Sequence, residues 1–483
     1  MRARTSKKSG RIAPAALCAR LVARAIIDAR SNGEITAQFG NSIASVGVFG
    51  GEAVDWLREL RAGVPLSALA PRGRKTSPEI DLLIRRLAAL CLIEYRLEHP
   101  QDGGDLIVAE PQVQNYWPQI PRLQNTDTLV LSRFAYMRRR HEIVLESPRA
   151  GALFKILDPQ FAALIAGLAS PQRVAQLRRM NGFPGLAPLA LLVDGQILLK
   201  IGAADEKSVH AAESDAGLDL WEFHDLLFHA RSSKGRHANP IGAVYPHVGA
   251  ISPLPAVRPR WPGKKIELRK FAAADAVSPF ARLLHERQST RSFDDSQPIT
   301  LAELSQLLGQ TARVLSKSDS KADFDDGGLT RRPYPSAGAS YELELYITVN
   351  ACDGLTRGFY HYDADADALV PIDVSPADLE TLLSETKHAM GAATTPQILL
   401  TMAARFGRVS WKYGTIAYAL ILKDVGVLTQ TLYLAATEME LGGCAVGIVN
   451  IDLFARMTGI DFATEGPVGQ FAIGRPKRFA ASD

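Results

Sequence analysis

Two arginines with a hydroxyl between them form the first candidate site in this chain. Arg287, Ser289 and Arg291 follow a short stretch of helical apolar spacing. Two guanidinium groups four positions apart can both donate charge-assisted hydrogen bonds to one phosphate. On its own the pattern is also typical of a solvated surface, so it predicts an anion site only when other motifs accompany it.

Two segments rich in small residues could approach a flat ligand. The first is the loop 334–342, whose Gly338 can adopt a positive φ, and the second is 441–448. Small side chains leave backbone N–H groups accessible to a ligand. Taken singly, the first segment is an ordinary turn and the second a glycine-terminated helix leading into a strand.

No metal site is expected. The four cysteines are far apart in the sequence: Cys18, Cys91, Cys352 and Cys444. His224, His229 and His237 are five and eight positions apart and have no supporting cysteine, so ordinary polar or packing roles are predicted. Reduced thiols fit this spacing best, and Cys444 is expected to be a small buried thiol.

The C-terminal part of the chain has the pattern of an α+β domain that would position these motifs. Helical spacing covers 281–286 and 301–308, and β-forming residues cover 343–349 and 397–402. Residues 416–441 form a long helix that is apolar nearly all round. Such a helix must be buried, either in the centre of the domain or at a dimer interface.

The first 200 residues or so show one pattern used twice. The first copy has strands within 35–48, helices at 51–61 and 77–92, and a strand at 93–97. The second copy has a strand at 142–146, helices at 158–168 and 171–179, and a strand at 195–201. Each copy is interpreted as a winged-helix-like unit, which gives two units, 1–110 and 111–205.

An extended linker, 206–270, is expected before the C-terminal domain, 271–483. Its prolines forbid long helices: Pro240, Pro246, Pro253, Pro255, Pro259 and Pro262. We therefore expect this segment to wrap a surface in extended form.

Length and composition predict a modular protein that is soluble and cytoplasmic. A chain of 483 residues with 47% apolar and 22% charged residues needs more than one core and is typical of globular domains. The first 24 residues contain no acidic residue and seven basic ones: Arg2, Arg4, Lys7, Lys8, Arg11, Arg20 and Arg24. The last two interrupt any signal-peptide core, and no window holds the roughly 18 uninterrupted apolar residues of a membrane helix.

Six motifs, taken in order, resemble the SagB-type dehydrogenases. They are Arg287-x-Ser289-x-Arg291-x-Phe293, the Tyr-Pro-Ser-Ala-Gly loop at 334–338, and the segments 358–362, 411–414, 441–447 and 473–476. The resemblance covers about 221–478. These enzymes are FMN-dependent azoline oxidases with the nitroreductase fold, found in microcin, streptolysin-S-type and cyanobactin biosynthesis.

The resemblance implies an FMN-dependent oxidase that converts peptide thiazolines and oxazolines to thiazoles and oxazoles. It assigns FMN binding to Arg287, Ser289, Arg291, Pro335, Ser336, Ala337, Gly338, Gly447, Ile448, Asn450 and Arg475. The loop 335–338 would come from the second subunit of a homodimer. Lys412 and Tyr413 match the family's catalytic pair. The family often continues Lys-Tyr-Gly with arginines, whereas this chain has Thr415 and Ile416, which leaves open the substrate contacts beyond Tyr413.

The implied reaction explains the need for such a pair. Aromatising an azoline removes a proton from one ring carbon and a hydride from its neighbour, so a base must face the flavin. Lysine and tyrosine normally titrate near ~10.4 and ~10, so burial or a cationic neighbour is needed to make either a base at neutral pH. Which of the two residues is the base stays open.

The N-terminal units are expected to bind the leader of a precursor peptide as an added strand, or to dock the cyclodehydratase. Nucleic acid is the alternative for a winged helix, but the net charge of +4 is small and no helix is packed with arginine and lysine. For the whole chain, the alternatives are an NAD(P)H-dependent nitroreductase and an inactive peptide-binding scaffold. The Lys412–Tyr413 pair and the long N-terminal region favour the oxidase over the nitroreductase.

Overall fold

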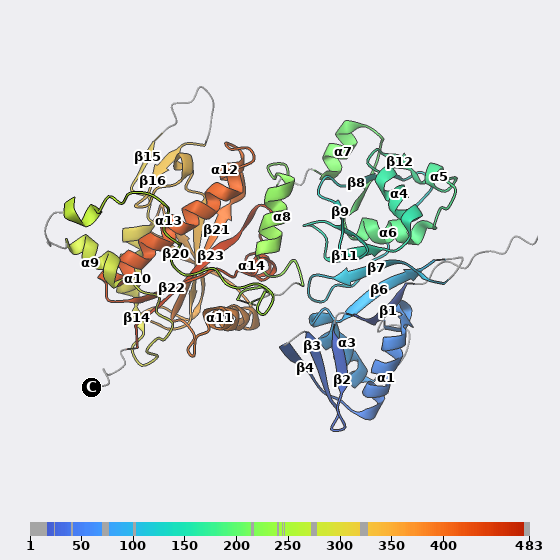
Figure 1. Cartoon of the computed structure of the whole chain (residues 1–483), viewed down its shortest axis with the longest axis horizontal. Coiled ribbons are helices and arrows are strands. Elements are labelled where there is room, and N and C mark those ends of the chain that lie inside the picture. The colour runs from blue at the N-terminus through green and yellow to red at the C-terminus, as the bar shows by residue number, and fades with distance from the viewer. Residues whose placement is uncertain are drawn as a thin grey trace, which may run out of the picture. The chain divides into compact units, whose positions relative to one another are not determined.

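The chain forms two compact units, which we call the N-terminal unit and the C-terminal domain (Figure 1). The computed structural model describes residues 17–23, 25–39, 42–69, 77–99, 103–213, 217–238, 241–243, 245, 247–271, 278–318 and 327–477. The N-terminal unit is Met1–Arg231 with Gly235–Ala238, and the C-terminal domain is Ser232–Lys234 with Asn239–Asp483. The basic N-terminal segment 1–16 lies outside the described residues.

The N-terminal unit is built on a seven-stranded antiparallel sheet. Its strands, in spatial order, are β5 (Val64–Pro65), β1 (Cys18–Leu21), β6 (Ile93–Glu98), β7 (Asp105–Pro111), β11 (Ala152–Ile156), β10 (Ile143–Glu146) and β9 (Tyr136–Arg139). Two three-stranded sheets accompany it: β2 (Ile26–Ala29), β3 (Glu34–Phe39) and β4 (Ser42–Val48), and β12 (Gln172–Arg173), β8 (Thr128–Leu131) and β13 (Leu198–Ile201). Its helices are α1 (Gly51–Ala62), α2 (Leu66–Leu69), α3 (Pro78–Ala89), α4 (Pro159–Gly167), α5 (Val174–Leu177), α6 (Leu186–Asp194), α7 (Glu206–Glu213) and α8 (Phe223–Ser232).

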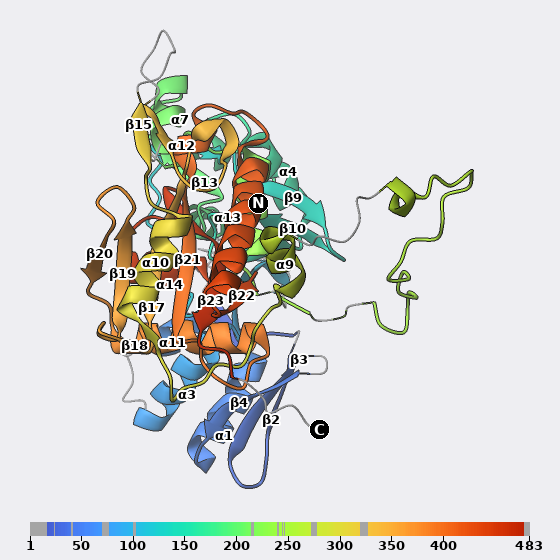
Figure 2. The same cartoon turned by 90° about the vertical axis from the view of Figure 1, so that its left-hand side faces the viewer.

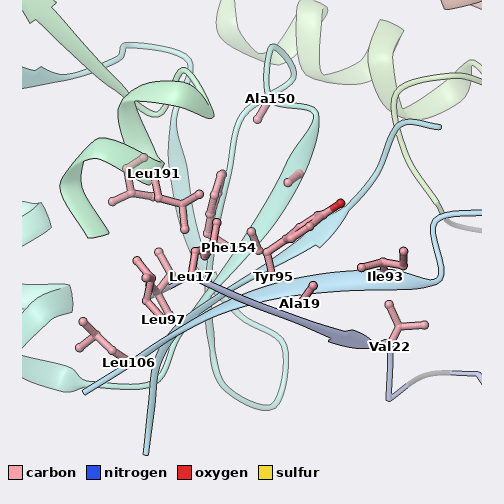
Figure 3. Packing of buried hydrophobic residues seen from close by; sticks show 14 of the residues in the cluster. Leu17, Ala19, Val22, Ile93, Tyr95, Leu97, Leu106, Ala150, Phe154 and Leu191 are labelled. Carbon is pink, nitrogen blue, oxygen red and sulfur yellow. The ribbon is translucent and has the colours of Figure 1, made fainter. Parts of the chain in front are cut away.

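One expected strand of each winged-helix-like unit, β6 of the first and β10 of the second, lies in this large sheet. The boundary expected at residue 110 falls inside β7, which pairs with β6 on one side and β11 on the other. Figure 3 shows the common core, in which Tyr95 and Leu97 of β6 belong to the same cluster as Phe154 of β11 and Leu191 of α6. Alternation predicts which face of a strand is buried but not which strand it pairs with. The boundary predicted at residue 110 therefore falls within one continuous sheet.

The linker expected at 206–270 is not extended throughout. Its first part contains α7 and α8, because the prolines that forbid helices begin only at Pro240. From Ile251 to Glu267 the structure contains no helix or strand, as the later prolines predict. Pro240 and Pro246 lie outside the described residues.

The C-terminal domain is a six-stranded antiparallel sheet with helices on both faces, which confirms the predicted α+β class. The strands, in spatial order, are β20 (Ala368–Ile372), β19 (Gly358–Asp363), β17 (Leu343–Val349), β21 (Ile398–Arg405), β23 (Glu465–Gly474) and β22 (Gly442–Val446). The helices are α9 (Pro279–Glu286), α10 (Leu301–Thr311), α11 (Pro376–Met390), α12 (Phe406–Ser410), α13 (Ala417–Glu438) and α14 (Ile451–Thr458). Short pairs join β14 (Ile299–Thr300) to β18 (Cys352–Asp353) and β15 (Ser316–Ser318) to β16 (Leu329–Arg331), and the 3-10 turn η2 covers Ala337–Ala339.

Alternate side chains of β23 show how the sheet is covered. Phe471 contacts Tyr433 of α13, with ring centroids 4.8 Å apart. Its neighbour Ala472 belongs to a cluster with Leu379 of α11 and Phe454 of α14. Since successive residues of a strand face opposite sides, α13 covers one face and α11 with α14 the other. Figure 2 shows α13 running along its face of the sheet.

The long apolar helix predicted at 416–441 is α13, but a single chain buries only part of it. Eight of its residues are buried, among them Asp424, Leu428 and Tyr433. The helix is long and apolar enough to cross a membrane by length and composition alone, which is weak evidence because core helices pass the same test. Only 33% of the residues in its most apolar window are buried in one chain, so the core of a single protomer does not supply all of the predicted burial.

Candidate active site

Helix α13 connects the two halves of the candidate site. Asp424 binds the predicted small-residue loop, and Tyr433 binds the segment that contains the two predicted arginines. Nine residues separate them, which is about 13 Å along a helix that rises ~1.5 Å per residue. The sequence analysis did not single out either residue.

Tyr433 joins three segments at one end of the site. Its hydroxyl shares a hydrogen bond of 2.8 Å with Ser289 Oγ and accepts another of 2.8 Å from the backbone N–H of Ala445. The Arg287 guanidinium lies over its ring, 5.0 Å from the centroid. Thr290 N–H donates to the Gly443 carbonyl at 2.8 Å, which pairs the arginine segment with β22. The structure therefore brings the arginine segment and the segment 441–448 together.

The three predicted arginines differ in their partners. Within the described part of the chain, the side chains of Arg287 and Arg291 form no hydrogen bond and no ion pair, and Arg291 is exposed. Arg475, in contrast, binds both carboxylate oxygens of Glu303, at 2.8 and 2.9 Å. Glu303 also accepts from the N–H of Thr300 in the capping box that begins α10. Arg475 thus links the end of β23 to α10, and its contact with a phosphate stays a prediction.

The loop 335–338 is held from below by polar contacts. Ala337 N–H donates to Asp424 Oδ2 at 2.9 Å, and Tyr341 N–H donates to Ser336 Oγ at 2.9 Å. Gly338 has a φ of 57°, in the left-handed region that its sequence context predicted. The loop is therefore a defined turn in which Gly338 is exposed.

Lys412 and Tyr413 lie against that glycine. Lys412 Nζ donates to the Gly338 carbonyl at 3.2 Å. A Cβ atom at Gly338 would lie 2.3 Å from Tyr413 Oη and 2.9 Å from Lys412 Nζ, closer than real Cβ atoms approach. The predicted catalytic pair, which follows α12, thus meets a loop 74 positions earlier in the chain. Lys412 is exposed and Tyr413 half-buried, so both are within reach of a ligand.

The remaining predicted residues follow β22. Gly447 is exposed, and an added Cβ would meet no atom within 4 Å, so its backbone is open. The Asn450 side chain is occupied: its Oδ1 caps α14 by accepting from Leu453 N–H at 3.0 Å, and its Nδ2 donates to Glu385 at 3.1 Å. Ile448 is half-buried. Cofactor contacts from Ile448 and Asn450 stay predictions.

Two buried carboxyl groups beneath the loop were missed by the sequence analysis. Glu342 is 1% exposed and Asp424 is 5% exposed. Burial, and after it the charge of Asp424, raise the pKa of Glu342 to about 7. A glutamate directly before a β-strand carries no signal that it will be buried, so only the packing of α13 over the loop identifies it.

His229 and Cys444 could suggest other chemistry, but both side chains are buried. His229 lies in the N-terminal unit, is fully buried and stacks on Trp221, with ring centroids 5.7 Å apart. Burial, and after it the charge of Arg236, lower the pKa of His229 to about 3. Cys444 is buried in β22, and burial raises the pKa of its thiol. Across the described residues, no three His, Cys, Asp or Glu side chains are grouped as a metal site requires.

Comparison with protein families gives two matches. The nitroreductase family model matches residues 284–475, which contain every element of the candidate site. The model described as cyanobactin oxidase ThcOx matches residues 129–238. These matches confirm the resemblance to SagB-type dehydrogenases.

Individual relatives agree with these matches. A protein of Methanocaldococcus jannaschii named as a nitroreductase is 33% identical over 165 residues, which are 34% of this chain and 76% of the relative. The microcin B17-processing protein McbC of Escherichia coli is 26% identical over 151 residues, 30% of this chain and 54% of the relative. Among solved structures, the Escherichia coli microcin synthetase McbBCD complex with truncated pro-MccB17 bound has a chain with 20% identity and a TM-score of 0.39, covering 55% of this chain and 97% of that one.

The extent of these matches decides the family. The first relative shares a third of its aligned residues with this chain and is covered over three quarters of its length. The family model covers the sheet, α13 and both halves of the candidate site. The chain belongs to the nitroreductase family.

Proposed function

We propose that the chain is an FMN-dependent azoline oxidase, which converts thiazolines and oxazolines of a ribosomally made peptide to thiazoles and oxazoles. The observation that carries the proposal is the contact of Lys412 and Tyr413 with the Gly338 loop. Two polar side chains that can take a proton thereby lie at the loop that the family resemblance assigns to the flavin ring. The match to the cyanobactin oxidase model and the relative that processes microcin B17 support the choice of substrate.

The residues present fit FMN. Arg287 and Arg291 offer guanidinium groups that have no hydrogen bond or ion pair among the described residues, as an anion-binding pair requires. Gly447 offers open backbone, and Ser289 a hydroxyl held by Tyr433. When bound, the flavin supplies the acceptor for the hydride that leaves the azoline ring.

The chain's own residues then carry out the proton transfer. Lys412 or Tyr413 takes the proton from the ring carbon next to the one that loses the hydride. The Gly338 carbonyl orients the Lys412 side chain, and the absence of a side chain at Gly338 leaves room for the Tyr413 hydroxyl. Lys412 is exposed in a single protomer, so the bound peptide or a second subunit must supply the burial that favours a neutral amine.

A homodimer is part of this proposal. Eight residues of α13 are buried in one chain, whereas apolar residues such as Leu420, Val427 and Leu434 are only half-buried. Several large apolar side chains between α8 and α9 are also exposed: Tyr245, Val248, Ile251, Leu254, Val257 and Trp261. A second copy would cover such surfaces, since monomers rarely leave large apolar areas in water. It would also bring the loop 335–338 to the flavin of the other subunit.

The N-terminal unit is proposed to bind the leader of the precursor peptide, and the cyclodehydratase is the proposed partner enzyme. The sheet β2–β3–β4 has an edge at β4, which pairs only with β3 among the described strands. Ile43 and Val48 of this edge strand are 66% and 70% exposed. An exposed strand edge with apolar side chains accepts an added peptide strand.

The test follows the mass of a peptide that already carries azolines. Each oxidised ring loses about 2 Da, the mass of the proton and hydride removed. Lys412→Ala and Tyr413→Phe are expected to slow this loss by about 10²–10⁴-fold, the usual effect of removing a general base. Lys387→Ala, at the end of α11, is the matched control and should oxidise the peptide like the wild type. Flavin absorbance must stay unchanged in all variants, and full activity of both site variants would contradict the assignment.

The competing function is NAD(P)H-dependent reduction of nitro compounds, favoured by the name of the archaeal relative. The two activities are separated by the electron donor. An azoline oxidase reduces its flavin with the peptide, whereas a nitroreductase reduces it with NADH. Rapid bleaching of the flavin by NADH, together with no turnover of the azoline peptide, would favour the nitroreductase.

A further inference from the structure

The buried acid pair of Glu342 and Asp424 holds two consecutive residues of the loop. Glu342 lies directly before β17 and Asp424 lies on α13. Glu342 Oε2 accepts a hydrogen bond of 3.3 Å from Ser336 Oγ, and Asp424 Oδ2 accepts one of 2.9 Å from Ala337 N–H. The pair therefore supports the loop from two different elements of the domain.

The two carboxyl groups differ in how their oxygens are bound. Asp424 accepts a backbone N–H, whereas Glu342 Oε1 has no hydrogen-bond partner within the described residues. A buried carboxylate oxygen without a donor is costly, but a protonated carboxyl group loses little. Burial and the Asp424 charge accordingly raise the pKa of Glu342 to about 7.

The other charged and titratable groups around Glu342 do not neutralise it. They are Arg332 and Tyr334 from the segment before the loop, Glu344 from β17 and Arg405 from β21. Arg332 donates to the Leu343 carbonyl at 3.2 Å and forms no ion pair with any described residue. Arg405 meets Glu342 through its backbone N–H, at 3.0 Å from the Glu342 carbonyl. A second negative charge at this place would therefore stand beside Asp424 without a paired cation.

The loop connects the acid pair to the proposed base. Ser336 and Ala337 are followed directly by Gly338, whose carbonyl accepts the hydrogen bond from Lys412 Nζ. Tyr413 Oη lies against the same glycine. A displacement of Ser336 or Ala337 therefore moves the acceptor of Lys412.

We propose that Glu342 and Asp424 are positioning residues: a single proton on Glu342 keeps residues 336–338 in place and thereby orients Lys412 and Tyr413. This inference rests on the proposed function. Loss of the proton puts two negative charges under the loop. A charged Glu342 holds Ser336 Oγ more strongly, whereas repulsion drives the Asp424 carboxylate away, so the bond from Ala337 N–H to Asp424 breaks and the acceptor of Lys412 moves. Activity therefore decreases as the pH rises through about 7, although a higher pH favours the deprotonated forms of lysine and tyrosine.

The first test is the pH profile of azoline oxidation between pH 6 and 9 at saturating peptide. Wild type should lose about tenfold in kcat by pH 8, because one ionisation near pH 7 leaves about a tenth of the molecules protonated there. Glu342→Gln keeps this position neutral and should lack the decrease. Glu344→Gln is the matched control, since Glu344 contacts His361 at 3.2 Å and should keep the wild-type profile. A decrease that persists in Glu342→Gln overturns the proposal.

The second test does not depend on turnover. Hydrogen exchange of the Ala337 amide, corrected for the intrinsic effect of pH, reports whether its bond to Asp424 is intact. Protection should decrease about tenfold from pH 6 to 8 in wild type and Glu344→Gln, but not in Glu342→Gln. Equal protection in all three proteins overturns the inference even if the enzyme is active. If the expected exchange pattern appears but none of the three proteins oxidises azolines, the role of the acid pair is supported and the proposed function is refuted.

Discussion

The substitution Gly338→Ala tests whether the loop and the proposed catalytic pair form one unit. Gly338 has a φ of 57° and a ψ of 25°, and an added Cβ would lie 2.3 Å from Tyr413 Oη. Ordinary contacts begin at about 3.4 Å. The Tyr413 side chain must therefore move by about 1 Å to admit the methyl group.

Two separate costs follow from this geometry. The left-handed backbone costs an L-residue roughly 1–2 kcal/mol relative to glycine, whatever surrounds it. The displacement of Tyr413 acts on the reaction, because a misplacement of about 1 Å can lower the rate about 10²-fold. We therefore expect a modest decrease in the free energy of unfolding and a large decrease in kcat.

Gly391→Ala separates these two costs. Gly391 ends α11 with a φ of 60° and a ψ of 33°, and an added Cβ there would meet no atom within 4 Å. The variant has nearly the same backbone cost as Gly338→Ala but no contact with the site. Both should melt about 2–8 °C below wild type, for a domain in which 1 kcal/mol shifts Tm by about 2–4 °C.

The assay is azoline oxidation, with flavin absorbance and thermal melting measured on the same samples. Gly391→Ala should retain wild-type kcat, while Gly338→Ala should lose about 10²-fold with flavin still bound. Wild-type kcat in Gly338→Ala would refute the reasoning, because Tyr413 would not depend on the loop. An equal loss of kcat in both variants would show that the effect is one of stability.

Three further predictions concern the cofactor, the acid pair and the dimer. Arg287→Ala combined with Arg291→Ala should release FMN, and full flavin absorbance after gel filtration would contradict a phosphate site. The raised pKa of Glu342 makes wild type less stable as the pH rises from 4.5 to about 7, because the unfolded state loses the proton first. The decrease in the free energy of unfolding amounts to at most about 3 kcal/mol; urea unfolding at pH 5 and 8 should show this decrease in wild type but not in Glu342→Gln. Val427→Glu, on the partly covered face of α13, should give a monomer without flavin in sedimentation velocity, and a flavin-loaded monomer of wild type would exclude the dimer.

Local sequence was sufficient for most elements of the C-terminal domain. Apolar periodicity predicted α13 and β17 nearly to the residue, because both are long or rich in β-forming residues. The glycine at position 338 predicted a positive φ, and the order of the motifs indicated the family. These features depend on neighbouring residues along the chain, so no knowledge of packing is needed.

Strand pairing was decided by the tertiary structure alone. The N-terminal pattern correctly indicated β6 and β10 but not that strands of both repeats join one sheet through β7. Register and partner depend on which faces are buried together, which alternation in one strand does not specify.

The state of each site residue was likewise decided by packing. Arg287 and Arg475 are both arginines in matching motifs, yet only Arg475 is bound by a carboxylate, because β23 ends beside the start of α10. Glu342 has a proton affinity set by Asp424, 82 positions later in the chain, and by the burial that α13 imposes. Charge, burial and partners in this domain come from distant segments that meet only in the fold, whereas the candidate residues themselves can be identified in the sequence.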